Sequence, residues 1–529
     1  MKNSFRLSLT WLHTWSGLLI GWILFAVFVT GTATYFRHEI TRWMQPELRG
    51  GASPIDTARA AVARLETVAA DSDSWFINLP DARDPSTVIF WREPGQRRFG
   101  TETLDPHTGE KLTARDTRGG EFFYRFHFQF MLPHPWGRYL AGVAAMFMFV
   151  ALISGIVAHR RFFKDFFTFR NGLGSLRTWL DFHNVSAVLA LPFYLMISYS
   201  ALVIFMYMYM PWGDRALSDG SRPPPRRAAP QGAGGKAEAK PWIATAPVGP
   251  MLDEAARRWG RDGSTLQRLS FSGRGTGKAT ATLIRADGEH ISTTHREQLR
   301  FNAVTGELLP GEETRAGPAA AIHGTLYGLH LAHFAGPVLR WLFFLMGAMG
   351  SALVATGLVL WTVKRRPQQK AGKRLSFGHG LVERLNIAAI AGLPVAVAVF
   401  FWANRLLPSG LEARADIEER CFLIAWAVML LHPLVRPVMR AWREQLWLGA
   451  ALYLALPFLD LCAGPWLKAA FARGDSTYLG FHAVIVFVGL MLVVAARKAG
   501  RPRPPKPGVA SAYAHQTAAG APPAPPRPV

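Results

Sequence analysis

The segment from Phe126 to His183 decides how the rest of the chain is interpreted: FHFQFMLPHPWGRYLAGVAAMFMFVALISGIVAHRRFFKDFFTFRNGLGSLRTWLDFH. Its apolar residues run from about Trp136 to Ala158, roughly the 20 residues that a helix needs to cross a bilayer. His127 and His134 precede this run, and His159 follows it. Histidines therefore lie at both ends of one predicted span, which indicates two metal or haem positions at different membrane depths.

The composition is that of a polytopic membrane protein. Half of the 529 residues are hydrophobic, and they gather in long blocks. The net charge of +23 does not indicate nucleic-acid binding, because Lys and Arg lie beside the ends of these blocks, as membrane orientation requires. Cys421 and Cys462 are far apart, which excludes a disulfide framework and a cysteine-ligated cluster.

Basic residues at the ends of the apolar blocks predict the topology. The first block is too long for a signal peptide and follows Lys2 and Arg6, so we expect it to be retained with the N-terminus in the cytoplasm. Basic residues after the second and fourth blocks place those loops in the cytoplasm as well: Arg160, Arg161, Lys164, Arg170 and Arg177, then Lys364, Arg365, Arg366, Lys370, Lys373 and Arg374. Two soluble regions would then lie outside.

We expect about eight transmembrane helices, at about 10–36, 136–158, 179–210, 337–363, 385–407, 417–435, 446–467 and 478–496. The predicted organisation is helix 1 (1–36), a soluble module (37–135), helices 2 and 3 with their basic loop (136–210), a linker and second module (211–336), helix 4 (337–363), a cytoplasmic loop (364–384), helices 5 to 8 (385–497) and a disordered cytoplasmic tail (498–529).

The first half of the chain contains an internal repeat. Each soluble region has a helical segment followed by strand-like segments, which predicts a small α+β module. The turn LDPHTGEKL (104–112) matches FNAVTGELL (301–309), and the span that follows each module carries matching landmarks: Arg138 with Ser154-Gly155, and Arg340 with Thr356-Gly357. The repeat therefore includes membrane helices.

Four stretches resemble the PepSY-associated transmembrane family of iron-regulated membrane proteins: LHTWSGLLIGWILFAVFVTGT (12–32), ISGIVAHRRFFKDFFTFR (153–170), WLDFHNVSAVLALPFYLMISYSAL (179–202) and LHLAHFAGPVLRWLFFLMGAMGSALVATGLVLW (329–361). The two TGE-containing modules are similar to PepSY domains. This resemblance implies a four-helix core that holds two b-type haems, with PepSY modules on the periplasmic face of a bacterial inner membrane. It also implies the reduction of ferric siderophores.

The histidines separate into two groups by depth. His13, His159 and His183 fall on the cytoplasmic side, and we expect two of them to be axial ligands of one haem. For the external haem we expect His127 and His330, with His38 and His333 in reserve. Spans of about 25 residues would separate the groups by roughly 30 Å or more. Near the external face, Arg138 and Arg340 are candidates to pair with haem propionates or an anionic substrate.

Other functions stay open at this stage. HLAH (330–333) offers two histidines on one helical face, but no Asp, Glu or Cys in that segment completes a tetrahedral zinc site. The sequence places no GxGxxG, Walker or flavin signature between a strand and a helix, so the electron donor would be membrane quinol or a separate cytoplasmic reductant. The leading hypothesis is a di-haem reductase of ferric siderophore or another ferric chelate. The alternatives are an iron-chelate transporter or permease subunit and a PepSY-based peptidase regulator.

Overall fold

The computed structural model describes residues 2–48, 52–81, 83–93, 99–159, 176–210, 212, 242–260, 265–286, 290–294, 297–310, 317–366 and 376–499. Part of the predicted topology lies outside these ranges, namely Arg160, Arg161, Lys164 and Arg170 of the first basic loop, Lys370, Lys373 and Arg374 of the second, nearly all of the linker 211–241, and the tail from 500 onward.

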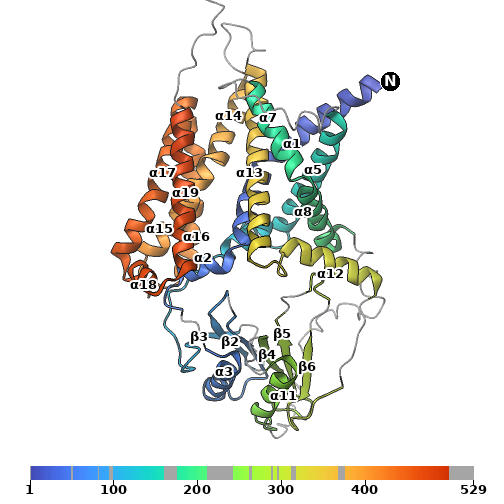
Figure 1. The fold of residues 1–529 in the computed structure, drawn as a ribbon, viewed down its shortest axis with the longest axis vertical. Helices are drawn as coiled ribbons and strands as arrows, with labels where there is room; N and C mark the ends of the chain where they lie inside the picture. The colour runs from blue at the N-terminus through green and yellow to red at the C-terminus, as the bar shows by residue number, and fades with distance from the viewer. Residues whose placement is uncertain are drawn as a thin grey trace, which may run out of the picture.

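A bundle of long helices stands on an antiparallel sheet (Figure 1). The helices are α1 (Lys2–Thr34), α2 (Arg37–Met44), α3 (Pro54–Val68), α4 (Glu121–Gln129), α5 (Trp136–Ala158), α7 (Leu176–Leu189), α8 (Leu191–Ile204), α9 (Met206–Tyr209), α11 (Gly249–Trp259), α12 (Pro318–Leu331), α13 (Pro337–Arg365), α14 (Phe377–Ile390), α15 (Gly392–Leu406), α16 (Arg414–Val435), α17 (Val438–Ala463), α18 (Trp466–Arg473) and α19 (Ser476–Ala499). The strands are β1 (Ser74–Asn78), β2 (Thr87–Arg92), β3 (Gly100–Leu104), β4 (Leu266–Ser272), β5 (Thr280–Arg285) and β6 (Gln298–Asn302).

The helices make this a multi-pass membrane protein. In the described part of the chain, six spans are long and apolar enough to cross a bilayer, and α7 with α8 adds a seventh if this pair, bent by 68°, counts as one span. From the sequence, about eight spans are predicted. The difference is α16, which carries Arg414, Asp416, Glu418, Glu419 and Arg420 in its first two turns. Its length is sufficient, but its first half is too charged for hydrocarbon.

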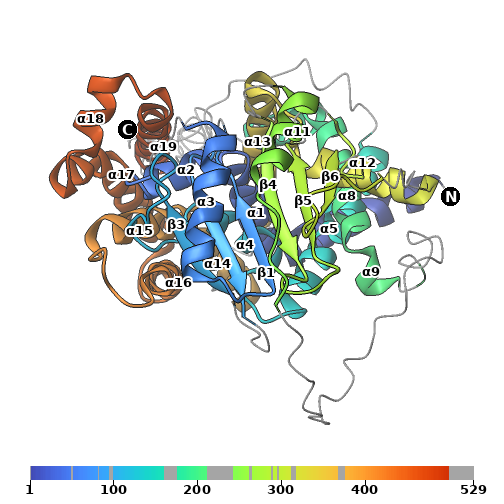
Figure 2. The same cartoon turned by 90° about the horizontal axis from the view of Figure 1, so that it is seen from below.

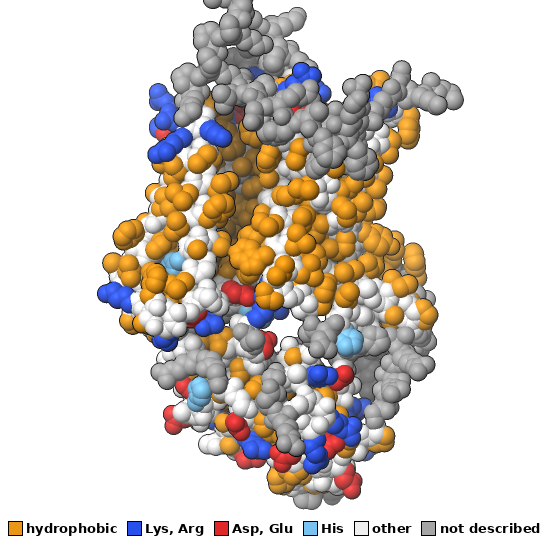
Figure 3. Space-filling model, in the orientation of Figure 1, with side chains coloured by type: hydrophobic (Ala, Val, Ile, Leu, Met, Phe, Trp, Pro, Cys, Tyr) orange, Lys and Arg blue, Asp and Glu red, His pale blue; other side chains and the backbone are white. Residues whose placement is uncertain are grey.

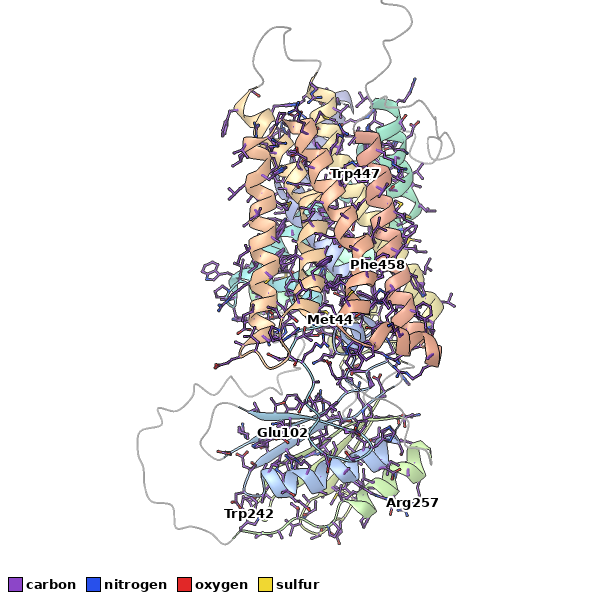
Figure 4. All side chains as sticks on the ribbon, turned by 90° about the vertical axis from the view of Figure 1, so that its left-hand side faces the viewer. Met44, Glu102, Trp242, Arg257, Trp447 and Phe458 are labelled. Carbon is purple, nitrogen blue, oxygen red and sulfur yellow. The ribbon has the colours of Figure 1, made fainter. Side chains whose placement is uncertain are left out.

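The outer surface of the bundle is largely apolar on the face that Figure 3 shows. Hydrophobic side chains form a broad band across the helices on this face, with charged groups at both ends of the band. On α17, Phe458 is 71% exposed and Trp447 is 39% exposed, and Figure 4 shows both on the helical part, above Met44 at its boundary with the sheet domain. Large exposed apolar side chains in such a band are expected where lipid replaces water as the solvent.

The two soluble modules form one domain. The strand order is β3-β2-β1-β4-β5-β6, so the two three-stranded units join through the antiparallel pair β1–β4. Each three-stranded unit has two edge strands, and the pairing of β1 with β4 covers one edge of each unit, which leaves β3 and β6 as the edges of the sheet. Figure 2 shows α3 and α11 on the face of the sheet that points away from the membrane helices. The two predicted α+β modules therefore share one six-stranded sheet.

The repeat is visible in equivalent backbone bonds. After β3, the Asp105 amide donates to the Glu110 carbonyl, and after β6 the Asn302 amide donates to the Glu307 carbonyl, both at 2.8–2.9 Å. Both turns contain a glycine with positive φ, Gly109 (71°) and Gly306 (79°), which is the conformation that glycine adopts without strain. The TGE turns thus end equivalent strands in the two halves.

One buried arginine holds the junction of the two halves. Arg274, just after β4, is 7% exposed and lies 3.3 Å above the ring of Trp75 in β1. Its Nη1 donates to the carbonyls of Ala70 and Ser72, both at 2.9 Å. A planar guanidinium can stack and donate at the same time, whereas an ammonium group cannot.

Arg274→Lys is therefore expected to loosen β1 and β4. Losing the stacking and one carbonyl bond should cost about 2 kcal/mol, or about a 30-fold increase in amide exchange where exchange occurs by opening of this junction. Hydrogen exchange of the full-length protein, read by mass spectrometry, measures the change. Arg257→Lys is the matched control, because Arg257 is 71% exposed and contacts only Glu254 among the ion pairs of the described residues. Unchanged exchange in β1 and β4 would contradict this role of Arg274.

Candidate functional site

Two pairs of histidine rings face each other inside the first group of helices. Close to the sheet, His127 of α4 and His330 of α12 have ring centroids 6.2 Å apart, and we call them the sheet-side pair. Towards the opposite end of the bundle, His13 of α1 and His183 of α7 have centroids 6.4 Å apart, and we call them the far-side pair. Each pair brings together residues from helices that are distant in sequence.

These separations fit two imidazoles on opposite sides of one metal ion. Two metal–nitrogen bonds of about 2.0 Å and two ring radii of about 1.1 Å place the centroids about 6.2 Å apart. No group of three or more His, Cys, Asp or Glu that could hold a metal occurs within the described ranges. A pair of imidazoles alone leaves the remaining coordination positions to a planar tetradentate ligand, which is what haem provides.

Backbone carbonyls fix the far-side rings. The Nδ1 of His13 lies 2.8 Å from the Ala151 carbonyl oxygen of α5, and the Nδ1 of His183 lies 3.1 Å from the Leu353 carbonyl oxygen of α13. A carbonyl can only accept, so Nδ1 donates in both rings. Each neutral ring then keeps the lone pair of Nε2 for a metal.

The sheet-side rings are fixed in the same way. The Nδ1 of His127 donates to the Val27 carbonyl of α1 at 2.8 Å. For His330, Nδ1 is 2.8 Å from the Ser200 hydroxyl oxygen of α8, and the ring also hydrogen-bonds the backbone of Ile197. Since the Ser200 hydroxyl donates to the Met196 carbonyl, it accepts from His330. All four rings therefore hold a proton on Nδ1.

A small residue makes room for each ring. Gly155, Gly357 and Gly31 come four residues after the carbonyls of Ala151, Leu353 and Val27, so they lie beside these carbonyls on the helix surface. A Cβ at Gly31 would lie 2.5 Å from His127 Nδ1, and Cβ atoms at Gly155 and Gly357 would lie 3.0 and 3.2 Å from the Cε1 atoms of His13 and His183. A larger side chain would push the imidazole away from its carbonyl.

The repeat relates the members of each pair. The acceptor and glycine on α5, Ala151 and Gly155, precede Leu353 and Gly357 on α13 by 202 residues. Likewise, His13, Val27 and Gly31 precede His183, Ile197 and Ala201 by 170 residues. Each pair therefore has one histidine from each half of the repeat, held by an equivalent carbonyl.

The vertical distance between the two pairs is shorter than the sequence predicts. On α1, Val27, which holds His127, is 14 residues after His13, or about 21 Å along the helix axis. The expected separation was roughly 30 Å or more. The distance is smaller because α4 packs beside α1. His127 therefore bonds a carbonyl that lies about two turns before the end of α1.

A cavity adjoins the sheet-side pair. Its volume is about 980 Å³, within the range of cofactor pockets, and its lining includes His127, His330, Gly31, Arg138, Tyr124 and His323. Arg138 Nη1 donates to the Tyr207 hydroxyl at 3.1 Å, while its buried Nε has no hydrogen-bond partner within the described structure. A guanidinium at the cavity wall with a free Nε donor is suited to a carboxylate ligand.

Arg340 occupies a different environment from Arg138. It lines a smaller neighbouring pocket with His38 and His333, and its Nη1 is 3.3 Å from Glu39. Burial acts to raise the pKa of Glu39, but the hydrogen bonds and charge of Arg83 outweigh burial and lower that pKa. Arg340 thus faces a carboxylate of the protein instead of the large cavity.

The other predicted histidines lie outside the two pairs. His159 follows the last residue of α5, and its amide donates to the Gly155 carbonyl at 3.1 Å. His38 Nδ1 lies 3.4 Å from Asp84. Ser200 and the cavity residue Tyr124 are not predicted from the sequence, and His323, which the sequence does not favour as a ligand, also lines the cavity. The position of Ser200, three residues after the Ile197 backbone, is the only local signal for its role.

Comparison with known proteins agrees with this architecture. The family model described as the PepSY-associated TM region matches residues 10–364, which include all four paired histidines and the whole sheet. The chain is also similar to the uncharacterized protein PA4219 of Pseudomonas aeruginosa, with 26% identity over 392 residues, covering 70% of this chain and 93% of that protein. The chain belongs to the PepSY-associated transmembrane family.

Proposed function

We propose that the protein is a di-haem b oxidoreductase of a bacterial inner membrane, which carries electrons outward and reduces ferric iron, bound to siderophore or another chelate, on the periplasmic sheet side. The observation that carries this proposal is the pair of ring separations, 6.2 and 6.4 Å, together with Nδ1 contacts that leave the Nε2 lone pair of each ring available for a metal. Bound haem would supply one-electron chemistry at two depths of the membrane.

The protein's own residues would hold, orient and insulate these groups. His13 with His183 and His127 with His330 would supply the nitrogen ligands, and carbonyls of α1, α5 and α13 with the Ser200 hydroxyl of α8 hold the rings in place. Between the two levels the helices pack an apolar cluster that includes Ile20, Leu152, Tyr194 and Leu353, while Leu24, Phe28, Met148 and Phe193 of the same cluster also line the cavity. Apolar side chains at this depth disfavour the passage of ions across the membrane.

The sheet-side cavity is where we expect the ferric acceptor to be reduced. Besides helix residues, Thr294 from the segment between β5 and β6 reaches its lining, so the extramembrane domain contributes to its wall. Arg138 gives the cavity a positive charge that favours a propionate or an anionic chelate.

A permease for iron chelates is the second candidate, because one observation favours it. The span formed by α7 and α8 is broken by 68° at Ala190, and discontinuous spans are typical of transporter substrate sites. A permease would move the intact chelate and show no reducible chromophore. Absorbance of the purified protein before and after dithionite therefore separates the two candidates, and absence of a haem spectrum would overturn the reductase.

Substituting one member of each histidine pair is expected to remove one haem at a time. His183→Ala should lose the far-side haem and His127→Ala the sheet-side haem, because a single axial imidazole remains in each case. Haem content per protein should fall from about two to about one in each variant. His107→Ala, in the turn after β3, is the control. Retention of both haems in both variants would contradict the assignment.

Replacing a glycine beside one ring should affect only the haem at that pair, as replacing a histidine should. Gly31→Val is expected to displace His127, and Gly155→Val to displace His13, so each should lower the occupancy of one haem about tenfold, as loss of an outer-shell contact does to metal affinity. Gly17→Val is the matched control on α1, where an added Cβ meets nothing within 4 Å. Equal haem content in all three variants would contradict the close packing of ring on glycine.

Arg138 and Arg340 are expected to affect the midpoint potential of the sheet-side haem to different extents. Removing a positive charge near the sheet-side haem destabilises its reduced form, so Arg138→Gln should shift the midpoint potential of that haem by roughly −50 mV. Arg340→Gln should shift it much less, because Arg340 lies outside the large cavity and pairs with Glu39. Redox titration of the two variants measures both values. A larger shift from Arg340 would reverse this assignment.

A further inference from the structure

A group of polar atoms on the far side of the bundle is buried without hydrogen bonds. We call Trp361 and Arg366 of the α13 end with His379 and Glu383 of α14 the far-side polar cluster. In the part of the chain that the structure describes, the Nε1 of Trp361, both ring nitrogens of His379 and the Oε2 of Glu383 have no hydrogen-bond partner. Each such atom costs about 1–3 kcal/mol, so four in one place indicate a missing polar ligand.

The cluster has a compact geometry. His379 is 2% exposed and Glu383 is 6% exposed, and as residues i and i+4 they share one face of α14. The ring centroids of His379 and Trp361 are 5.9 Å apart, and His379 Nε2 is 3.4 Å from Glu383 Oε1, without hydrogen-bond geometry. Three different side chains thus direct unpaired donors and acceptors to one small volume.

One oxygen of Glu383 is connected to the aqueous surface. Arg366 Nη2 donates to Glu383 Oε1 at 2.8 Å, and the Arg366 side chain is 53% exposed. Glu383 Oε2 has no such partner. A carboxylate with one oxygen in the interior and one at a hydrated arginine is placed to accept a proton from a buried ligand and release it to water.

The cluster lies next to the far-side histidine pair. Gly357 of α13 contacts His183, and Trp361 is one turn further along the same helix, about 6 Å. Leu18, Leu358 and Val382 form an apolar core beside it. Asn386 of α14 locks this packing, because it donates to the Leu358 carbonyl and accepts from Trp22 of α1. A ligand here would be close to the far-side haem position.

The helix that carries His379 and Glu383 has exposed apolar side chains, with Phe377 85% and Leu381 41% exposed. In Figure 1 this helix, α14, lies between α19 and α13, and Figure 3 shows an apolar furrow between the C-terminal helices and the rest of the bundle. The burial of His379 and Glu383 among apolar side chains favours a ligand that partitions into the bilayer over a water-soluble reductant.

We infer that the far-side polar cluster is the oxidation site for a membrane hydroquinone, which would be the electron donor in the function proposed above. The hydroquinone loses two electrons and two protons and leaves as the quinone. Its electrons would leave one at a time for a one-electron ferric haem acceptor that His13 and His183 would hold. One phenolic proton goes to His379 and the other to Glu383, and Trp361 Nε1 donates to a quinone oxygen.

Stopped-flow reduction of the full-length, haem-loaded protein by decylubiquinol tests this site. His379→Gln and Glu383→Gln should each slow haem reduction by about 100-fold, the usual effect of removing a proton acceptor. Dithionite should still reduce both variants fully, with unchanged spectra, which shows that the haem sites are intact. His432→Gln and Glu444→Gln are matched controls, because this second His–Glu pair, 3.0 Å apart, joins α16 and α17 and lies outside the cluster. They should reduce at the normal rate.

A second measurement keeps this inference separate from the haem proposal. Binding of oxidised decylubiquinone, followed by quenching of tryptophan fluorescence, requires no haem, and Glu383→Gln and His379→Gln should weaken it while the control variants do not. Haem-loaded protein that decylubiquinol does not reduce, or variants that reduce and bind like the wild type, would overturn the inference and leave the di-haem proposal intact. Protein without haem would refute the di-haem proposal, and the binding data would then decide the quinone site alone.

Discussion

The candidate site depends on one constraint, which is that an imidazole facing a metal must have its other nitrogen held. In this protein a helix carbonyl holds that nitrogen, and a helix carbonyl is already bonded to the amide four residues later. The imidazole can reach the same oxygen only if the side chain at that later position is very small. Gly31, Gly155 and Gly357 meet this condition, and Ala201 occupies the fourth equivalent position. The glycines therefore fix ring orientation, and with it the Nε2 directions on which any shared metal depends.

This constraint also explains what the sequence could predict about the site. Depth along the spans separated the histidines into two groups, and the repeat selected His330 as the counterpart of His127. Depth alone cannot choose among His13, His159 and His183, because that choice depends on which face of each helix meets a glycine. Nor could it distinguish Arg138 from Arg340. Their repeat positions are equivalent, but the Glu39 partner of Arg340 comes from α2, outside the repeated landmarks.

The fold was predictable wherever the signal is local. Long apolar blocks indicate helices, and the TGE turns indicate equivalent modules. The pairing of β1 with β4 is not local, because it joins segments nearly 200 residues apart, and neither strand has a feature that marks its partner. The charged start of α16 is a similar case. Arg414 and Glu418 are fully buried, and they bond each other and Asn404 of α15. The neighbouring helix therefore stabilises charges whose burial cannot be predicted from hydropathy.

Buried ionic contacts also explain how the additional helices hold α14 beside the far-side pair. Arg405 of α15 donates to Asp460 of α17 at 2.6 Å and to the Trp43 carbonyl of α2, and Tyr478 and His482 of α19 also bond Asp460. Removing one partner would leave a buried charge unpaired, which typically costs about 3–5 kcal/mol. The network therefore fixes α15, α17 and α19 to α2, which is the continuation of α1 beyond a short turn. Because α14 leads directly into α15, the same network anchors the sheet-side end of the unit that carries His379 and Glu383, while Asn386 joins its far-side half to α1 and α13.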